Sequence, residues 1–335
     1  MPLFPKRAQH RAFTIWFEAS MFEQTITRHN ELIDPSLHVW GWEIPVYLFI
    51  GGLVAGIMVI SGYFVLKGQW KKNVFSCFYL PHISLILLSA GMFSLFLDLE
   101  HKLYVWRLYT TFQIASPMSW GAWILVLIYP ILFLNTLIRI PVQFQNKIPI
   151  FDKLSAFINK HPFLIKNIGI MNMLMGTLLG MYTGVLLSSL GARPLWNSSM
   201  LWMLFLVSGL SSAAAFVHLI TNDEYERELL AKADNAFLTL ELFVFGGFIS
   251  GLLTSTRVHI EAVRLILDGA YAAYFWVFVI LLGIIVPLGL QLLAVNHKVK
   301  HTPVAPILVI AGGLFLRFII VAAGQVSHWT SASIR

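Results

Sequence analysis

The chain has little charge and almost no cysteine, and both shortages exclude whole classes of protein. Only 12% of its 335 residues are charged, against 58% hydrophobic residues, whereas an average soluble domain carries roughly 25% charged residues. Cys77 is the single cysteine, which excludes a disulfide framework and an iron–sulfur cluster held by this chain alone, because a cluster needs about four thiolates. An ordinary cytosolic enzyme is excluded by the same composition. The sequence therefore indicates a polytopic membrane protein.

Long apolar runs define the fold class. Each predicted span is long enough to cross about 30 Å of hydrocarbon as a helix, and the short alternating runs of a membrane β-barrel are absent. We expect an all-α, polytopic membrane helical bundle of about eight transmembrane helices, for which two four-helix bundles are one possible packing. The membrane domain covers 44–326, between an N-terminal tail (1–43) and a C-terminal tail (327–335). The predicted spans are 44–66, 75–97, 118–138, 167–190, 200–220, 237–255, 272–295 and 305–325.

The net charge of +7 lies mainly in the short loops between spans. Such loops set membrane orientation, so we expect lipid rather than nucleic acid as the partner of these charges. The loops after spans one, three, five and seven hold 12 Lys and Arg, against 6 in the other loops and the C-terminal tail, while the N-terminal tail adds 4 to that second side. The positive-inside rule then places both termini on the outer, periplasmic side.

Polar side chains within the spans are the candidates for chemistry, because such groups are costly in a bilayer and usually lie in cavities or on pathways. Near the outer side, carboxylates, tyrosines and an arginine would supply donors and proton acceptors for a flat, largely apolar quinone site. The outer candidates are Glu43, Tyr47, Asp98, Glu100, Tyr182, Thr183 and Arg317. The inner candidates are His82, Asn172, His218, Glu241 and Gln291.

Each candidate also has a structural interpretation. Glu43 at a helix N-terminus can interact with the helix dipole, Tyr47 can anchor the interface, and Arg317 can neutralise an acid. His82 and His218 are the only histidines within the spans, and hydrogen-bonded packing is the commoner role for such residues than haem ligation.

Several sequence stretches resemble a known family. They are WEIPVYLFIGGLVAG at 42–56, WRLYTTF at 106–112 with SPMSWGAW at 116–123, YTGVLLS at 182–188, GARPLW at 191–196, and Leu316-Arg317 with Gly324-Gln325. In this order they resemble the NrfD/PsrC family, the polysulfide reductase type of membrane subunit. The resemblance covers about residues 38–326.

The resemblance implies a quinone-interacting membrane anchor subunit in the bacterial cytoplasmic membrane. Such a subunit exchanges electrons between menaquinone or ubiquinone, bound as substrate, and a ferredoxin-like iron–sulfur subunit. A catalytic subunit, either a molybdopterin enzyme or a multihaem cytochrome c, completes the complex. The resemblance also implies that this chain itself carries no haem and no iron–sulfur cluster, so the subunit alone would not turn over.

The resemblance also implies roles for the outer residues. The quinone-binding tyrosine of the fourth helix corresponds to Tyr182, with Thr183 beside it. Some family members carry an amide and a histidine on the first helix, where this chain has Glu43 and Tyr47. We expect Glu43 or Asp98 to relay the proton and Arg317 to stabilise negative charge on the substrate.

A function from another class stays open, namely a proton- or solute-conducting membrane protein without quinone chemistry. A conduit needs polar groups along its whole depth, whereas a quinone site needs them near one face. Glu241, Asn172 and His218 on the inner side fit a conduit, and Glu241 is the candidate for an inner proton route. Pairing of Glu241 with Arg227 or Lys232 is the structural alternative, and a b-type cytochrome is a third interpretation.

Overall fold

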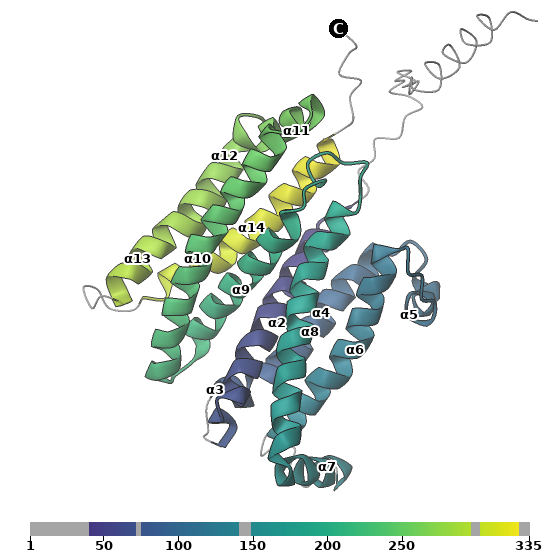
Figure 1. Cartoon of the computed structure of the whole chain (residues 1–335), viewed down its shortest axis with the longest axis vertical. Helices are drawn as coiled ribbons and strands as arrows, with labels where there is room; N and C mark the ends of the chain where they lie inside the picture. Colours follow the sequence, from purple (N-terminus) through teal and green to yellow (C-terminus); the bar gives the residue numbers. More distant parts are fainter. Residues whose placement is uncertain (1–39, 72–74, 141–148, 296–301, 328–335) are drawn as a thin grey trace, which may run out of the picture. The chain divides into compact units, whose positions relative to one another are not determined.

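The computed structural model describes residues 40–71, 75–140, 149–295 and 302–327. Over these residues the secondary structure is helical, and eight helices are long and apolar enough to span a membrane, which confirms the predicted fold class (Figure 1). The spanning helices are α2 (Glu43–Leu66), α4 (Leu80–Asp98), α6 (Pro117–Ile138), α8 (Pro162–Ser188), α9 (Leu201–Ile220), α10 (Glu224–Leu253), the continuous run α12, η3 and α13 (Ala272–Tyr274, Phe275–Ile285 and Val286–Val295), and α14 (Val304–Val326). The η3 segment is a π-helix.

The sixth span begins well before its predicted start at residue 237. Helix α10 starts at Glu224, where the Asp223 carboxylate accepts a hydrogen bond from the Tyr225 backbone N–H at 3.0 Å, a typical N-cap. Its first turns are rich in charge, so hydropathy alone missed them. Glu241 is therefore not one turn inside this span but about 26 Å along the helix, at 1.5 Å per residue.

The eight helices pack as two four-helix bundles. In the first bundle α2, α4, α6 and α8 contact one another in a closed ring, and in the second α9, α10, α13 with η3, and α14 do the same. Helices α2 and α9 form the main contact between the bundles (Figure 1). There a Cβ at Gly209 would lie 2.7 Å from the Gly52 carbonyl oxygen, so only glycine allows this close approach.

Short helices mark the two ends of the bundles. The α5 end carries η2 (Lys102–Tyr104), α5 (Trp106–Thr110) and α11 (Arg257–Leu267). The α7 end carries η1 (Gln69–Lys71), α3 (Phe75–Phe78) and α7 (Pro149–Lys160) (Figure 1). The orientation predicted from the loop charges makes the α5 end the outer end.

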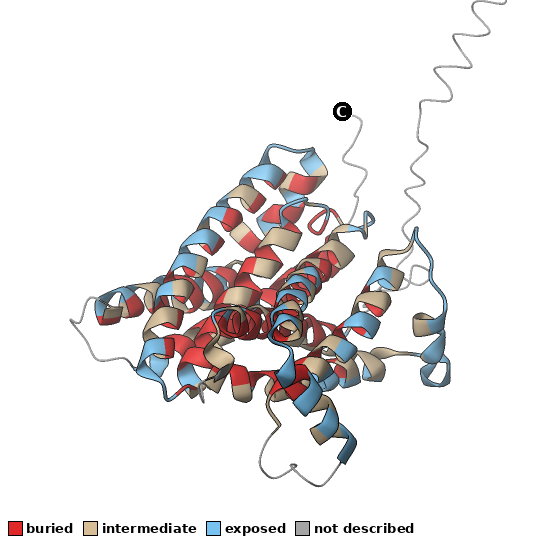
Figure 2. Ribbon diagram, turned by 60° about the horizontal axis from the view of Figure 1, so that its bottom comes forward, coloured by how far each residue is buried: buried red, intermediate tan, exposed pale blue. Residues whose placement is uncertain are grey.

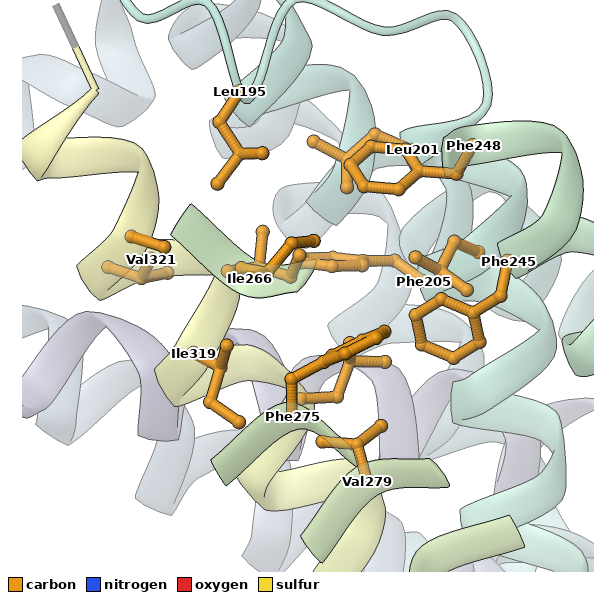
Figure 3. Packing of buried hydrophobic residues seen from close by; sticks show 14 of the residues in the cluster. Leu195, Leu201, Phe205, Phe245, Phe248, Ile266, Phe275, Val279, Ile319 and Val321 are labelled. Atoms are coloured by element: carbon orange, nitrogen blue, oxygen red, sulfur yellow. The ribbon is translucent and has the colours of Figure 1, made fainter. Parts of the chain in front are cut away.

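Buried residues follow the contacts between helices, while the outward helix faces are exposed (Figure 2). The largest apolar cluster lies in the second bundle towards the α5 end, where α11 packs over η3 and α14 (Figure 3). Phe205, Phe248 and Phe275 are fully buried there. This packing leaves two places in the protein interior where polar side chains gather, one in each bundle.

Candidate functional site

The first polar group, which we name the tyrosine cluster, consists of Glu43, Tyr47, Asp98, Tyr109 and Tyr182 at the α5 end of the first bundle. Tyr47 on α2 and Tyr182 on α8 are 5% and 6% exposed, and their phenols lie close enough to interact electrostatically. Among the described residues, neither hydroxyl makes a hydrogen bond to the protein. Both buried donors are therefore available to a ligand.

The position of the Tyr182 ring depends on a glycine of the facing helix. A Cβ at Gly121 of α6 would overlap the Tyr182 ring and its hydroxyl oxygen. Any larger side chain at residue 121 would thus push the phenol out of its place.

Two carboxylates lie at the same end of the first bundle as these tyrosines. Glu43 begins α2 and Asp98 ends α4, both are half-buried, and they interact electrostatically. The Ser94 hydroxyl donates to the Glu43 backbone oxygen at 2.9 Å and fixes the end of α4 against the start of α2. The fold therefore places Glu43, Tyr47, Asp98 and Tyr182 at one end of the first bundle, with Glu43 near Asp98 and Tyr47 near Tyr182.

Tyr109 joins the cluster from outside the spans. It lies on α5, interacts electrostatically with Tyr47, and is half-buried. Burial, and secondarily Tyr129, raises the pKa of the Tyr109 hydroxyl above its usual range. The phenol therefore stays protonated and able to donate at physiological pH.

Thr183 is adjacent to Tyr182 but its hydroxyl is already engaged. Thr183 is fully buried, and its Oγ1 donates to the Gly180 backbone oxygen at 2.8 Å. Its methyl group faces Gly51 of α2, where an added Cβ would be 3.5 Å away. In this arrangement Thr183 packs α8 against α2.

Arg317 lies with a different set of residues. Its guanidinium is fully buried in the second bundle, where it donates to the Ser208 hydroxyl at 2.5 Å, to the Gly313 oxygen at 3.0 Å and to the Phe205 oxygen at 2.9 Å. It also lies over the Phe205 ring, 4.9 Å from the centroid. Its Nη2 also lies 3.2 Å from the position of a Cβ at Gly52 of α2, so Arg317 lies where the two bundles meet.

The second polar group, which we name the arginine cluster, consists of Ser208, Asp234, Glu241, Gln291 and Arg317. Glu241 interacts with the Ser208 hydroxyl and with the Arg317 charge, and Asp234 interacts electrostatically with Glu241. The Asp234 carboxylate accepts hydrogen bonds at 2.6 Å from the Ser211 hydroxyl and at 2.7 Å from the Gln291 amide. Arg317 therefore interacts with one of these acids, Glu241, while Ser211 and Gln291 hold the other, Asp234.

The predicted structural partners of Glu241 have other contacts. Lys232 pairs with Glu228 at 2.6 Å on the exposed face of α10. Arg227 donates to the Thr221 backbone oxygen at 2.8 Å. Glu241 is buried and interacts with Arg317 instead, so the alternative that it pairs with Arg227 or Lys232 is wrong.

The remaining inner candidates lie towards the α7 end. His82 contacts the Phe78 backbone oxygen at 2.9 Å within its own helical turn. Asn172 is buried and donates to the Met58 oxygen at 2.8 Å, which joins α8 to α2. His218 lines a cavity of about 170 Å³ at the start of α14, together with Leu219, Arg227, Thr302, Pro303 and Pro306.

Comparison with known proteins settles the family of this chain. The family described as "Polysulphide reductase, NrfD" matches residues 27–328. The chain belongs to the polysulphide reductase NrfD family. This membership confirms the resemblance seen in the sequence.

Relatives in this family match the chain over most of their own length. The "Protein NrfD homolog" of Haemophilus influenzae is 30% identical over 314 residues, 86% of this chain and 95% of the relative. The C chain of the polysulfide reductase of Wolinella succinogenes is 30% identical over 313 residues, 86% of this chain and 94% of the relative. "Protein NrfD" of Escherichia coli is 27% identical over 315 residues, with 86% and 96% covered. The family and the eight helices make this chain a membrane subunit of an oxidoreductase complex.

Sequence reasoning missed two members of the polar clusters. Asp234 is seven residues before Glu241 on α10, so both lie on one helix face, but the predicted span began after Asp234 and left it in a loop. Tyr109 was counted among the aromatic residues of an interfacial segment. Only the packing of α5 against α6 brings its phenol near Tyr47.

Proposed function

We propose that this chain is the quinone-interacting subunit of a multi-subunit oxidoreductase, exchanging electrons between membrane quinone and an iron–sulfur partner. The observation that carries the proposal is the tyrosine cluster. Tyr47 and Tyr182 come from facing helices, are buried together, and leave their hydroxyls without partners among the described residues. A quinone has two carbonyl oxygens on a flat apolar ring, which suits two phenol donors in an apolar site.

The cluster also provides for the protons of quinone chemistry. In this proposal Tyr182 donates a hydrogen bond to one carbonyl oxygen and Tyr47 to the other. Glu43 and Asp98, half-buried beside them, exchange protons with the aqueous side. A carboxylate within reach of the ring oxygens can act as the general base when quinol is oxidised.

The electrons need a partner protein, because quinone is the only redox group proposed for this chain. The name of the Wolinella relative, as one lettered chain of polysulfide reductase, implies a complex with other subunits. We infer a ferredoxin-like iron–sulfur subunit next to this chain and a catalytic subunit beyond it, either a molybdopterin enzyme or a multihaem cytochrome c. The setting we infer is the bacterial inner membrane, with both termini on the periplasmic side.

The arginine cluster supports a second candidate role, proton conduction. Gln291, Asp234, Glu241 and Ser208 form a row of interacting polar side chains from the inner part of α13 to Arg317. The Arg317 Nε and the Gln291 Oε1 are buried without hydrogen-bond partners among the described residues. Such atoms are commonly satisfied by buried water, which would complete a proton path.

Quinone binding is tested in the assembled complex with a fluorescent quinoline N-oxide, an analogue of quinol. Losing one hydrogen bond costs about 0.5–1.5 kcal/mol, so Tyr182→Phe should raise the Kd by roughly 2- to 13-fold. Tyr274→Phe is the matched control, because Tyr274 is 55% exposed and lies in the other bundle. Equal Kd values for both variants and the unaltered complex would remove Tyr182 from the site.

A further inference from the structure

The outward face of the first bundle carries polar groups at a depth where lipid offers them no partner. Ser89 on α4 is exposed and Tyr129 on α6 is half-buried, and their hydroxyl oxygens approach to 3.4 Å. Ser89 lies about 14 Å from either end of α4, at 1.5 Å per residue, which is the middle of the bilayer. Polar groups at this depth usually face a cavity or a substrate pathway rather than lipid.

The Ser89 and Tyr129 hydroxyls are only weakly satisfied by each other. The Ser89 hydroxyl donates to the Leu85 backbone oxygen at 2.9 Å, so Tyr129 must be the donor across the 3.4 Å gap, which is long for a hydrogen bond between hydroxyls. Pro130 adds a further polar group, because a proline inside α6 leaves the Val126 carbonyl without its helical donor. Val126 is 37% exposed.

These outward groups connect to the tyrosine cluster through Tyr109. Tyr109 lies near both Tyr129 and Tyr47, and a Cβ at Gly121, eight residues before Tyr129 on α6, would overlap the Tyr182 ring. Tyr182 lies next to Tyr47. It is about 9 Å below the α5 end of α8, and Ser89 is about 14 Å below the α5 end of α4. A row of tyrosine side chains thus extends from the lipid-exposed seam between α4 and α6 to the buried pair, Tyr47 and Tyr182.

We propose that the seam between α4 and α6, lined by Ser89, Tyr129 and Tyr109, is the lateral passage through which an isoprenoid quinone reaches Tyr47 and Tyr182. This inference rests on the proposed quinone function. The polar headgroup moves past the hydroxyls of the seam, and the apolar tail stays against the exposed faces of α4 and α6. Tyr109, which belongs to α5 and not to a spanning helix, lies near both the seam and the cluster.

Two adjacent positions on α4 provide a matched test. Ser89 and Ala90 are both exposed in mid-membrane, but they point about 100° apart around the helix, and Ser89 points towards Tyr129 of α6. In the assembled complex, Ser89→Trp fills the seam and should lower turnover with a long-tailed menaquinol at least tenfold. Ala90→Trp adds the same bulk beside the seam and should keep turnover within twofold.

The possible outcomes separate the passage from the proposed function. If Ser89→Trp and Ala90→Trp behave alike while Tyr182→Phe weakens binding of the quinol analogue, the passage is wrong and the quinone function stands. If Tyr182→Phe also has no effect on binding, Tyr182 is removed from the quinone site and the passage is wrong as well, because it was proposed to lead to that residue.

A second measurement covers the case in which Ser89→Trp does not assemble. A menaquinone analogue with a photoreactive group on its isoprenoid tail is cross-linked to the unaltered complex. Labelling of the peptides that contain Ser89 or Tyr129 is expected. Labelling confined to helices of the second bundle would overturn the passage.

Discussion

Arg317 and Glu241 offer a quantitative test of the arginine cluster. The change is a double-mutant cycle of Arg317→Met, Glu241→Gln and both together, in which each substitution removes one charge and keeps much of the side-chain volume. Arg317 is 0% exposed and Glu241 is 4% exposed. Each charge is therefore held away from water and depends on the other through their electrostatic interaction and through Ser208, which lies between them.

The expected magnitude follows from this burial. Removing one partner of a buried charge pair leaves the other uncompensated and typically costs about 3–5 kcal/mol. Removing both leaves no buried charge at this position, apart from Asp234 nearby. The double variant should therefore lose less stability than the two single variants together, with a coupling of about 1–3 kcal/mol.

The assay is thermal unfolding of the full chain in detergent, with an exposed ion pair as control. Lys232 and Glu228 are 54% and 46% exposed and 2.6 Å apart on the same helix, α10. Their cycle, Lys232→Met with Glu228→Gln, should give a coupling of only about 0.3–0.5 kcal/mol. Additive effects in the Arg317–Glu241 cycle, no larger than in the control cycle, would refute the coupling of these buried charges.

Four further predictions test other parts of the structure. Glu241→Gln should abolish proton uptake from the α7 side in reconstituted complexes while quinol-analogue binding persists, and unchanged proton stoichiometry would limit Glu241 to a structural role. Gly121→Ala should displace the Tyr182 ring and lower quinol turnover in an assembled complex, whereas Gly246→Ala, with no atom within 4 Å of the added Cβ, should leave it unchanged. Burial, together with Glu226, raises the pKa of the Cys77 thiol to about 12, so the folded chain should not react with a water-soluble maleimide at pH 7–9; rapid labelling before denaturation would show that the thiol is accessible. Reporter fusions to the C-terminus should show it on the periplasmic side, and cytoplasmic reporter activity would reverse the predicted orientation.

The sequence was sufficient to predict the membrane helices because the bilayer imposes a length and a polarity on each of them. It failed at the start of α10, where the charged turn from Glu224 to Glu228 lowers the hydropathy of a segment that is still helical. It also did not predict α7, because three prolines between the third and fourth spans are typical of a loop. These are Pro141, Pro149 and Pro162. Pro149 and Pro162 instead begin helices, a position that proline tolerates.

The sequence predicted the candidate site only for residues that lie near the same end of their helices. Glu43, Tyr47, Asp98 and Tyr182 all lie near the same end of their helices, so their depth was readable from the sequence. Depth alone could not place Arg317, because residues at similar depth can belong to different bundles. Which helices touch is decided by packing, such as the contact of Gly52 with Gly209, and no single helix pattern contains that information.

The most direct test of the quinone proposal is single-turnover electron transfer between menaquinol and the iron–sulfur clusters of the partner subunit, followed by electron paramagnetic resonance in the assembled complex. A hydrogen bond that strengthens as charge develops on the substrate is worth more than one to a neutral carbonyl. We predict that Tyr182→Phe slows the transfer at least tenfold with full cluster content, while Tyr274→Phe leaves the rate unchanged. Equal transfer rates in the two variants and the unaltered complex would contradict the assignment of the tyrosine cluster as the quinone site.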